Sequence, residues 1–203
     1  MEGKRNRKRI WIPVILLLLA TVLAYGYFYE EDTGDPGMPT LTVETPQKLS
    51  AGQTKEFTLD VLISDLEDAR YPAMSMSISF DSSRLEFLGV EEGNIFILSA
   101  ESNSGQQLPD WSCNTQVCNE TGIINIMYLD MTGGKYAFSK DLLAEDDNVV
   151  LRLKFRLRGS VRSGDVLDLI LEDAVFAASD ETQSLAMTLD TLKTKDGRIV
   201  IGD

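Results

Sequence analysis

Few side chains in this sequence have the type and spacing that catalysis or metal binding requires. The chain contains no histidine, which excludes Ser–His and Cys–His nucleophile pairs as well as imidazole metal ligands. Carboxylates stand side by side at 91–92, 145–147 and 172–173, and glycosidases use such residues in pairs. Because 32 residues are acidic, adjacent carboxylates are expected by chance. The sequence therefore predicts that the protein is not an enzyme.

Two cysteines, Cys113 and Cys118, are separated by four residues. This spacing differs from a Cys-X-X-Cys redox motif, and without histidine it does not complete a zinc site. We predict a disulfide that closes a small loop and shapes the segment 99–121. Trp111 lies in the same segment, and two roles stay open for it: anchoring a partner or covering the edge of the domain.

The charge of the chain is uneven along its length. Net charge is −13 and the pI is about 4.4, so nucleic acid is not an expected partner. Five of the first nine residues are Lys or Arg, and residues 10–28 carry no charge, a length that nearly spans a bilayer core of ~30 Å.

These features divide the chain into four parts. We expect a basic cytoplasmic tail at 1–9, a transmembrane anchor at 10–28, a polar linker at 29–40 and a folded domain at 41–203. The alternative for 10–28 is a signal peptide cleaved after Ala24. Both interpretations place the domain outside the cytoplasm, bound to the cell membrane or, after cleavage, secreted.

Alternation of apolar and polar side chains dominates residues 41–203. It is clearest at 57–63, 74–80 and 151–157, and it is typical of strands with one buried and one solvated face. Further short apolar runs occupy 85–90, 123–129, 166–171 and 198–201, with turn-rich pieces between them. Only 138–145 has a helical pattern. The sequence predicts an all-β, antiparallel sandwich, long enough to bury its own core.

The order of these segments resembles the cohesin module of bacterial cellulosome scaffoldins. Residues 74–93 are similar to the family's strand, Tyr-Asp-Pro turn and Leu-Glu-Val strand. Residues 122–130, 132–141 and 149–158 resemble later strands and turns, and 196–202 resembles the closing Asp-Gly-X-Val-X-Val pattern. The resemblance covers 41–203 and rests on the order of several motifs.

The resemblance implies a jelly-roll sandwich of about nine strands and a non-catalytic role in protein binding. Cohesins capture dockerin modules of secreted proteins through one sheet. Carried onto this sequence, its outward residues are Ser75, Ser77 and Ser79 on the third strand, Asn125, Met127 and Leu129 on the fifth, and Arg152, Lys154 and Arg156 on the sixth. No cofactor is expected on this chain, because calcium would come with the dockerin.

The apolar and the charged side chains of this set each have a property that favours binding. Exposed Met127 and Leu129 beside small serines would form a slightly apolar patch, which is typical of an interface. The cations of 152–156 would suit an acidic dockerin helix. The alternatives are an ordinary polar strand face for the serines and, for the cations, a solvated face that balances nearby carboxylates.

Two other functions stay open at the level of sequence. A carbohydrate-binding sandwich would need a row of exposed aromatic side chains, and the domain offers Trp111, Tyr71 and Tyr136. A structural or adhesion module without a dockerin partner is the other alternative, because the sequence departs from the family pattern at two positions. Ser82 replaces the turn proline, and Ala73 replaces an asparagine that the family often uses for binding.

Overall fold

The computed structural model describes residues 37–45, 49–52, 56–95, 111–145, 147–179, 186–188 and 190–203. Met38–Asp203 form one compact unit. The expected tail at 1–9, the anchor at 10–28 and most of the linker at 29–40 lie outside the described residues, so these three stay predictions. Within the described ranges, no helix is both long enough and apolar enough to cross a bilayer.

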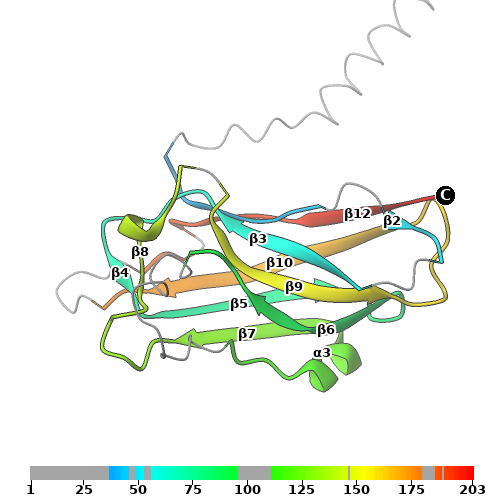
Figure 1. Ribbon diagram of the computed structural model, residues 1–203, viewed down its shortest axis with the longest axis horizontal. Helices are drawn as coiled ribbons and strands as arrows, with labels where there is room; N and C mark the ends of the chain where they lie inside the picture. The colour runs from blue at the N-terminus through cyan, green and yellow to red at the C-terminus, as the bar shows by residue number, and fades with distance from the viewer. Residues whose placement is uncertain are drawn as a thin grey trace, which may run out of the picture. The chain divides into compact units, whose positions relative to one another are not determined.

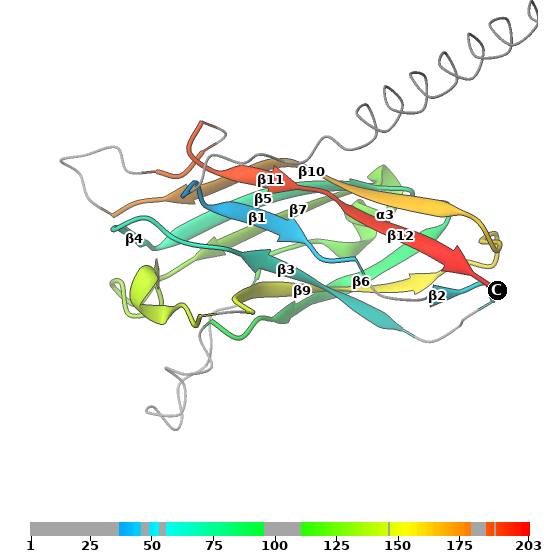
Figure 2. The same ribbon diagram turned by 90° about the horizontal axis from the view of Figure 1, so that it is seen from above.

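Two sheets form this unit (Figures 1 and 2). The strands of sheet I are β1 (Thr40–Val43), β3 (Phe57–Ile63), β6 (Leu85–Glu92), β9 (Val149–Leu157) and β11 (Lys193–Lys195), in the order β11-β1-β3-β9-β6. Those of sheet II are β2 (Leu49–Ser50), β5 (Ala73–Phe80), β7 (Ile123–Leu129), β10 (Val166–Ala177) and β12 (Gly197–Gly202), in the order β2-β12-β10-β5-β7. A short ribbon pairs β4 (Arg70–Tyr71) with β8 (Phe138–Ser139). The prediction of an all-β sandwich is confirmed, but the sheets are not purely antiparallel, because β11 pairs with β1 and β2 with β12 in parallel. The described residues form 12 strands rather than about nine, since several short strands have no clear alternation in the sequence.

Period-two patterning explains why these segments form strands. Along β5 the apolar residues from Met74 to Phe80 are buried, whereas the serines between them are exposed or half-buried. β10 continues beyond the predicted run 166–171. The sequence pattern stops at Leu171 because a bulge between Leu171 and Asp173 interrupts the alternation. At the bulge Glu172 and Asp173 are both exposed.

Aromatic side chains tie the two sheets together. The ring of Phe155 on β9 lies 5.6 Å from that of Phe80 on β5 and 5.4 Å from that of Phe87 on β6. Phe138 forms a second centre, 5.1 Å from Tyr128 and 5.4 Å from Phe176. All six of these aromatic residues are buried with the aliphatic residues of the core. The core therefore fixes the register of the strands that carry the outer faces.

The helix expected at 138–145 is not formed. Phe138 is fully buried and pairs with Tyr71 in the β4–β8 ribbon, which requires an extended backbone. A single 3-10 turn, η1 (Lys140–Leu142), follows and ends at Leu143, whose ψ is 139°. Tertiary pairing therefore overrides the helical pattern of this segment.

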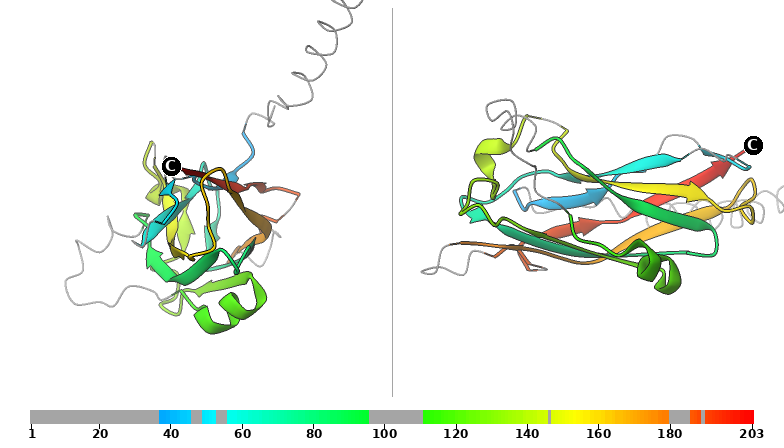
Figure 3. Two further views of the ribbon diagram at one scale, coloured as in Figure 1. Left: turned by 90° about the vertical axis from the view of Figure 1, so that its right-hand side faces the viewer. Right: turned by 60° about the horizontal axis from the view of Figure 1, so that its bottom comes forward.

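A helix forms instead at α3 (Thr115–Thr121), at the margin of the sandwich beside β6 and β7 (Figure 3). The Asn114 side chain caps it by accepting a hydrogen bond from the Val117 N–H at 3.2 Å. Gly122 ends it with φ 72°, and a Cβ at Gly122 would lie 2.9 Å from the Phe80 carbonyl oxygen. Cap and glycine are a sequence signal for this helix that patterning alone misses.

A buried carboxylate organises the loop that follows β7. Asp130 Oδ1 accepts a hydrogen bond from the Thr132 N–H at 2.8 Å, and its Oδ2 accepts one from the Tyr136 N–H at 3.2 Å. Burial alone would raise the pKa of Asp130, but the hydrogen bonds from Thr132, Tyr136 and Gly134 outweigh it, and the pKa is lowered. The loop presents Met131, which is 83% exposed.

We expect Asp130→Asn to lower the free energy of unfolding by about 2 kcal/mol at pH 7, because it weakens charge-assisted hydrogen bonds. A lowered folded-state pKa stabilises the fold above the unfolded-state pKa of about 3.9 and loses that effect as pH falls through the folded value. Urea unfolding at pH 7 and pH 3 should therefore give a difference between variant and wild type that shrinks in acid. Equal stability of the two proteins at pH 7 would contradict this account.

Candidate functional site

Sheet II presents a face made of short side chains flanked by longer ones. We call the outward side chains of β5, β7 and β10 the β5–β7–β10 face. On β5 they are Ala73, Ser75, Ser77 and Ser79, which lie opposite Leu129, Met127, Asn125 and Ile123 of β7 and opposite Ala177, Val175, Asp173 and Ile170 of β10. The small residues of the central strand make a shallow trough between the two flanking strands.

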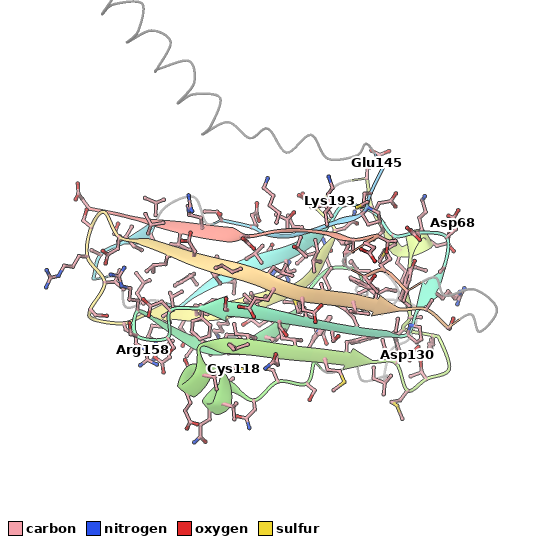
Figure 4. The ribbon with its side chains drawn as sticks, turned by 180° about the vertical axis from the view of Figure 1, so that it is seen from behind. Asp68, Cys118, Asp130, Glu145, Arg158 and Lys193 are labelled. Carbon is pink, nitrogen blue, oxygen red and sulfur yellow. The ribbon has the colours of Figure 1, made fainter. Side chains whose placement is uncertain are left out.

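Exposed apolar side chains gather on this side of the molecule. Met127 is 58% exposed and Leu129 is 54% exposed. Among the described residues, every other large hydrophobic side chain classed as exposed lies on sheet II, on the loop after β7 or on α3: Met131, Ile170, Val166, Val200 and Val117. A face with this many exposed apolar groups is typical of a protein-binding surface. Figure 4 views sheet II from this side.

Polar groups on the same face are only partly used within the chain. The Ser77 hydroxyl donates a hydrogen bond to Asn125 Oδ1 at 2.8 Å. Arg198 on β12 pairs with Asp168 at 2.8 Å, whereas the side chains of Glu172 and Asp173 have no ion-pair partner among the described residues. The face thus combines apolar contacts with hydroxyl, amide and carboxylate groups that a partner can reach.

The cations Arg152, Lys154 and Arg156 do not belong to this face, and the prediction that they share a sheet with the serines is wrong. They lie on β9, between β3 and β6 in sheet I. Alternation along β9 indicates which residues point outward but not which sheet the strand joins. Sheet I therefore carries these three cations, whereas the exposed large apolar strand residues lie on sheet II.

Carboxylates on β3, on β6 and at the residue before β3 pair with these three cations. Lys154 Nζ lies 2.8 Å from Glu56 Oε2, and Arg156 lies 2.8 Å from Glu56 Oε1. Hydrogen bonds from Lys154 and then Arg156 lower the pKa of Glu56. Arg152 pairs with Asp60, the residue opposite it on β3, at 3.1 Å. These ion pairs agree with the alternative interpretation of Arg152, Lys154 and Arg156, in which the three cations balance nearby carboxylates.

Cys113 and Cys118 are free thiols in the structure, in contrast to the predicted disulfide. Cys113 immediately precedes the cap residue Asn114, and Cys118 is the fourth residue of α3. Apolar side chains at these two positions often pack together and hold the start of a helix against the preceding segment. Cys118 is buried in the core and Cys113 packs against it. Burial, and then the neighbouring Cys118, raise the pKa of the Cys113 thiol, so both residues act as small apolar side chains.

Trp111 covers the sandwich beside β7. Its ring lies 5.1 Å from that of Tyr128 and 6.1 Å from that of Phe138. The next residue, Ser112, bridges Met127 through two backbone hydrogen bonds. Of the two roles left open by the sequence, covering the domain edge is the one that these contacts favour.

The described residues offer little to catalysis, metal binding or sugar binding. Within them, no group of three or more Cys, Asp or Glu is arranged to hold a metal ion. Tyr71 and Tyr136 are buried, at 0% and 3% exposure, so they cannot join Trp111 in an exposed aromatic platform. A polar hollow of about 440 Å³ lies near Arg70 and Lys140, and Lys140 is already paired with Asp65 and Asp68.

The family model described as "Cohesin domain" matches residues 39–194, which is most of the compact unit. The chain belongs to the cohesin family. The resemblance of the strand order to cohesins is thereby confirmed over almost the whole domain.

Solved cohesin structures share the fold of this cohesin. A type I cohesin–dockerin complex of OlpA from Clostridium thermocellum aligns with TM-score 0.57 and 17% identity over 81% of this chain and 99% of that one. The third ScaC cohesin of Acetivibrio cellulolyticus, in complex with a ScaB dockerin, aligns with TM-score 0.56 and 11% identity over 82% of this chain and 100% of that one. The seventh ScaB type I cohesin of Pseudobacteroides cellulosolvens aligns with TM-score 0.55 and 15% identity over 81% of this chain and 92% of that one. No curated protein matches the sequence.

Six of the nine binding residues predicted from the sequence of this cohesin come together on one face. Ser75, Ser77, Ser79, Asn125, Met127 and Leu129 all lie on the β5–β7–β10 face. The residues that sequence reasoning missed are those of β10, such as Ile170 and Asp173. The alternation of Leu167, Leu169 and Leu171 indicated that β10 is a strand, but nothing in the sequence paired it with β5.

Proposed function

We propose that this cohesin is a non-catalytic module that captures dockerin-bearing proteins through its β5–β7–β10 face. The observation that carries the proposal is the pair of exposed side chains Met127 and Leu129 beside the small residues of β5. Burying them against a partner removes apolar surface from water without requiring any rearrangement of the core. Membership of the cohesin family and the dockerin complexes of similar solved cohesins support the same partner.

We also propose that the module acts at the cell surface. Five basic residues before the uncharged segment 10–28 support an anchor with its amino terminus in the cytoplasm. The linker at 29–40 would span at most ~3.6 Å per residue, which keeps the module close to the membrane. Captured enzymes or scaffoldins would then be held near the cell.

Calcium enters this proposal through the partner. The chain has no Asp-x-Asp-x-Asp-Gly loop of the type that binds calcium. Removal of calcium should therefore abolish capture while leaving the thermal unfolding of this cohesin unchanged.

A calcium-dependent binding assay tests the proposal. Residues 38–203, which form a compact unit with a complete core, are titrated calorimetrically against a panel of calcium-loaded type I dockerins. Saturable binding that a chelator reverses is the expected result. Lack of binding to every dockerin by a folded domain would refute the proposal and favour a structural or adhesion role.

Charge reversal on sheet I should leave capture unchanged. We expect Lys154→Glu to alter dockerin affinity by less than about twofold, because stacked sheets lie ~10 Å apart and exposed charges are screened over ~8 Å at physiological ionic strength. The measurement is the same titration, after circular dichroism has verified that the variant folds. A tenfold or larger loss of dockerin affinity would indicate that the binding site lies on sheet I.

A further inference from the structure

A hollow of about 460 Å³ opens beside the β5–β7–β10 face, between α3 and the outer edge of β7. Its lining includes Met127 and Val117, both exposed apolar side chains, as well as the two cysteines. Cys118 lies at α3 next to β7 in Figure 4. The volume falls within the ~300–1,000 Å³ of typical ligand sites, which is large for a gap at the edge of a packed sandwich.

The polar groups of the hollow are arranged for a bound main chain. In the described part of the chain, the bridge from Ser112 to Met127 is what pairs with this edge of β7. Alternate residues of a strand turn their N–H and C=O groups to the same side, so the backbone groups of Asn125, two residues before Met127, face the same edge. The Asn125 side chain accepts from Ser77 through Oδ1, which leaves its Nδ2 group to donate elsewhere.

We propose that this hollow is a specificity pocket of the binding face, and that it receives one apolar side chain of the bound dockerin. The inference rests on the proposed function and adds where the partner is anchored. The hollow is continuous with the β5–β7–β10 face. Both include Ser75, Ser77, Asn125 and Met127. A partner that covers the face therefore closes the mouth of the hollow.

The chemistry of the lining defines the occupant. The side chains of Cys113, Cys118, Met127 and Val117 form apolar walls, which favour an aliphatic or aromatic side chain over a charged one. The Asn125 amide and backbone groups can satisfy the peptide group of the residue that carries it. Buried anchors of this kind contribute a large share of binding energy in protein interfaces.

Two variants on α3 separate the pocket from its surroundings. Val117 lines the hollow and is 46% exposed, whereas its neighbour Gln116 is exposed and does not line it. In calorimetric titration of residues 38–203 with a captured dockerin, Val117→Asp should weaken binding at least about tenfold, the effect of losing one anchor. Gln116→Asp adds the same charge one residue away and should stay within about twofold of wild type.

Alkylation of Cys113 by N-ethylmaleimide gives a second readout. Because Cys113 is half-buried in the lining, its reaction followed by mass spectrometry should be at least about tenfold slower when dockerin saturates the protein, since a filled pocket excludes the reagent. Wild-type affinity of Val117→Asp, or an unchanged alkylation rate in the complex, would overturn the pocket while leaving dockerin capture established. Failure of the wild-type protein to bind any dockerin would overturn both.

Discussion

Replacing Met127 by aspartate is expected to weaken dockerin capture by about 100-fold or more, equivalent to about 2.8 kcal/mol. Met127 lies on β7, the outer strand of the β5–β7–β10 face, opposite Ser75, and more than half of its side chain is exposed. In the complex the new carboxylate would be removed from water, and the residues that lie beside it across the sheet, Ser75 on β5 and Val175 on β10, carry no positive charge to compensate it. Leu129→Asp should act in the same direction.

The measurement is a calorimetric titration of each variant with the dockerin that the wild-type domain binds best. Neither substitution should unfold the protein, because both side chains already face solvent. Thr58→Asp is the matched control, since Thr58 is an exposed strand residue on sheet I. Unchanged affinity of both Met127→Asp and Leu129→Asp would place the interface elsewhere on the molecule.

Truncating Phe155 to alanine is expected to lower the free energy of unfolding by about 3–5 kcal/mol, the usual cost of removing a buried aromatic ring. The ring is fully buried and lies within 6.1 Å of the rings of Phe57, Phe80 and Phe87. Because Phe80 belongs to sheet II and the others to sheet I, the cavity would loosen the contact between the sheets. Urea denaturation followed by fluorescence or circular dichroism measures the change.

Phe57→Ala is the comparison for this prediction. Phe57 stacks on Phe155 but is only half-buried at the start of β3, so its loss should cost clearly less than that of Phe155. Equal losses for the two variants, or a loss below about 1 kcal/mol for Phe155→Ala, would mean that the sheets are held together elsewhere.

Most of the fold could be predicted from the sequence because its strands alternate regularly. β3, β5, β6, β7, β9 and β12 start or end within about two residues of the predicted runs, the usual error of element boundaries. The predictions failed where long-range pairing decides the conformation. The segment 138–145 has a helical pattern, yet Phe138 is held in the β4–β8 ribbon, and α3 depends on the cap at Asn114 and on Gly122.

The binding face could be predicted only in part for a related reason. Period two identifies outward residues on any strand, so it found Met127 and Leu129 together with Lys154. The sheet that each strand joins is set by contacts between distant segments, such as Phe155 with Phe80, and these leave no local pattern. The ion pairs of Lys154 with Glu56 and Glu91 likewise become visible only once β3, β6 and β9 are neighbours.

The most direct test of the account is a methyl-labelled NMR titration of residues 38–203 with a calcium-loaded dockerin. We expect the methyl signals of Met127, Leu129 and Ile170 to shift or broaden, while those of Leu62 and Leu88 on sheet I stay in place. Perturbation centred on Leu62 and Leu88, or no perturbation with any type I dockerin, would contradict the claim that this cohesin binds its partner through the β5–β7–β10 face.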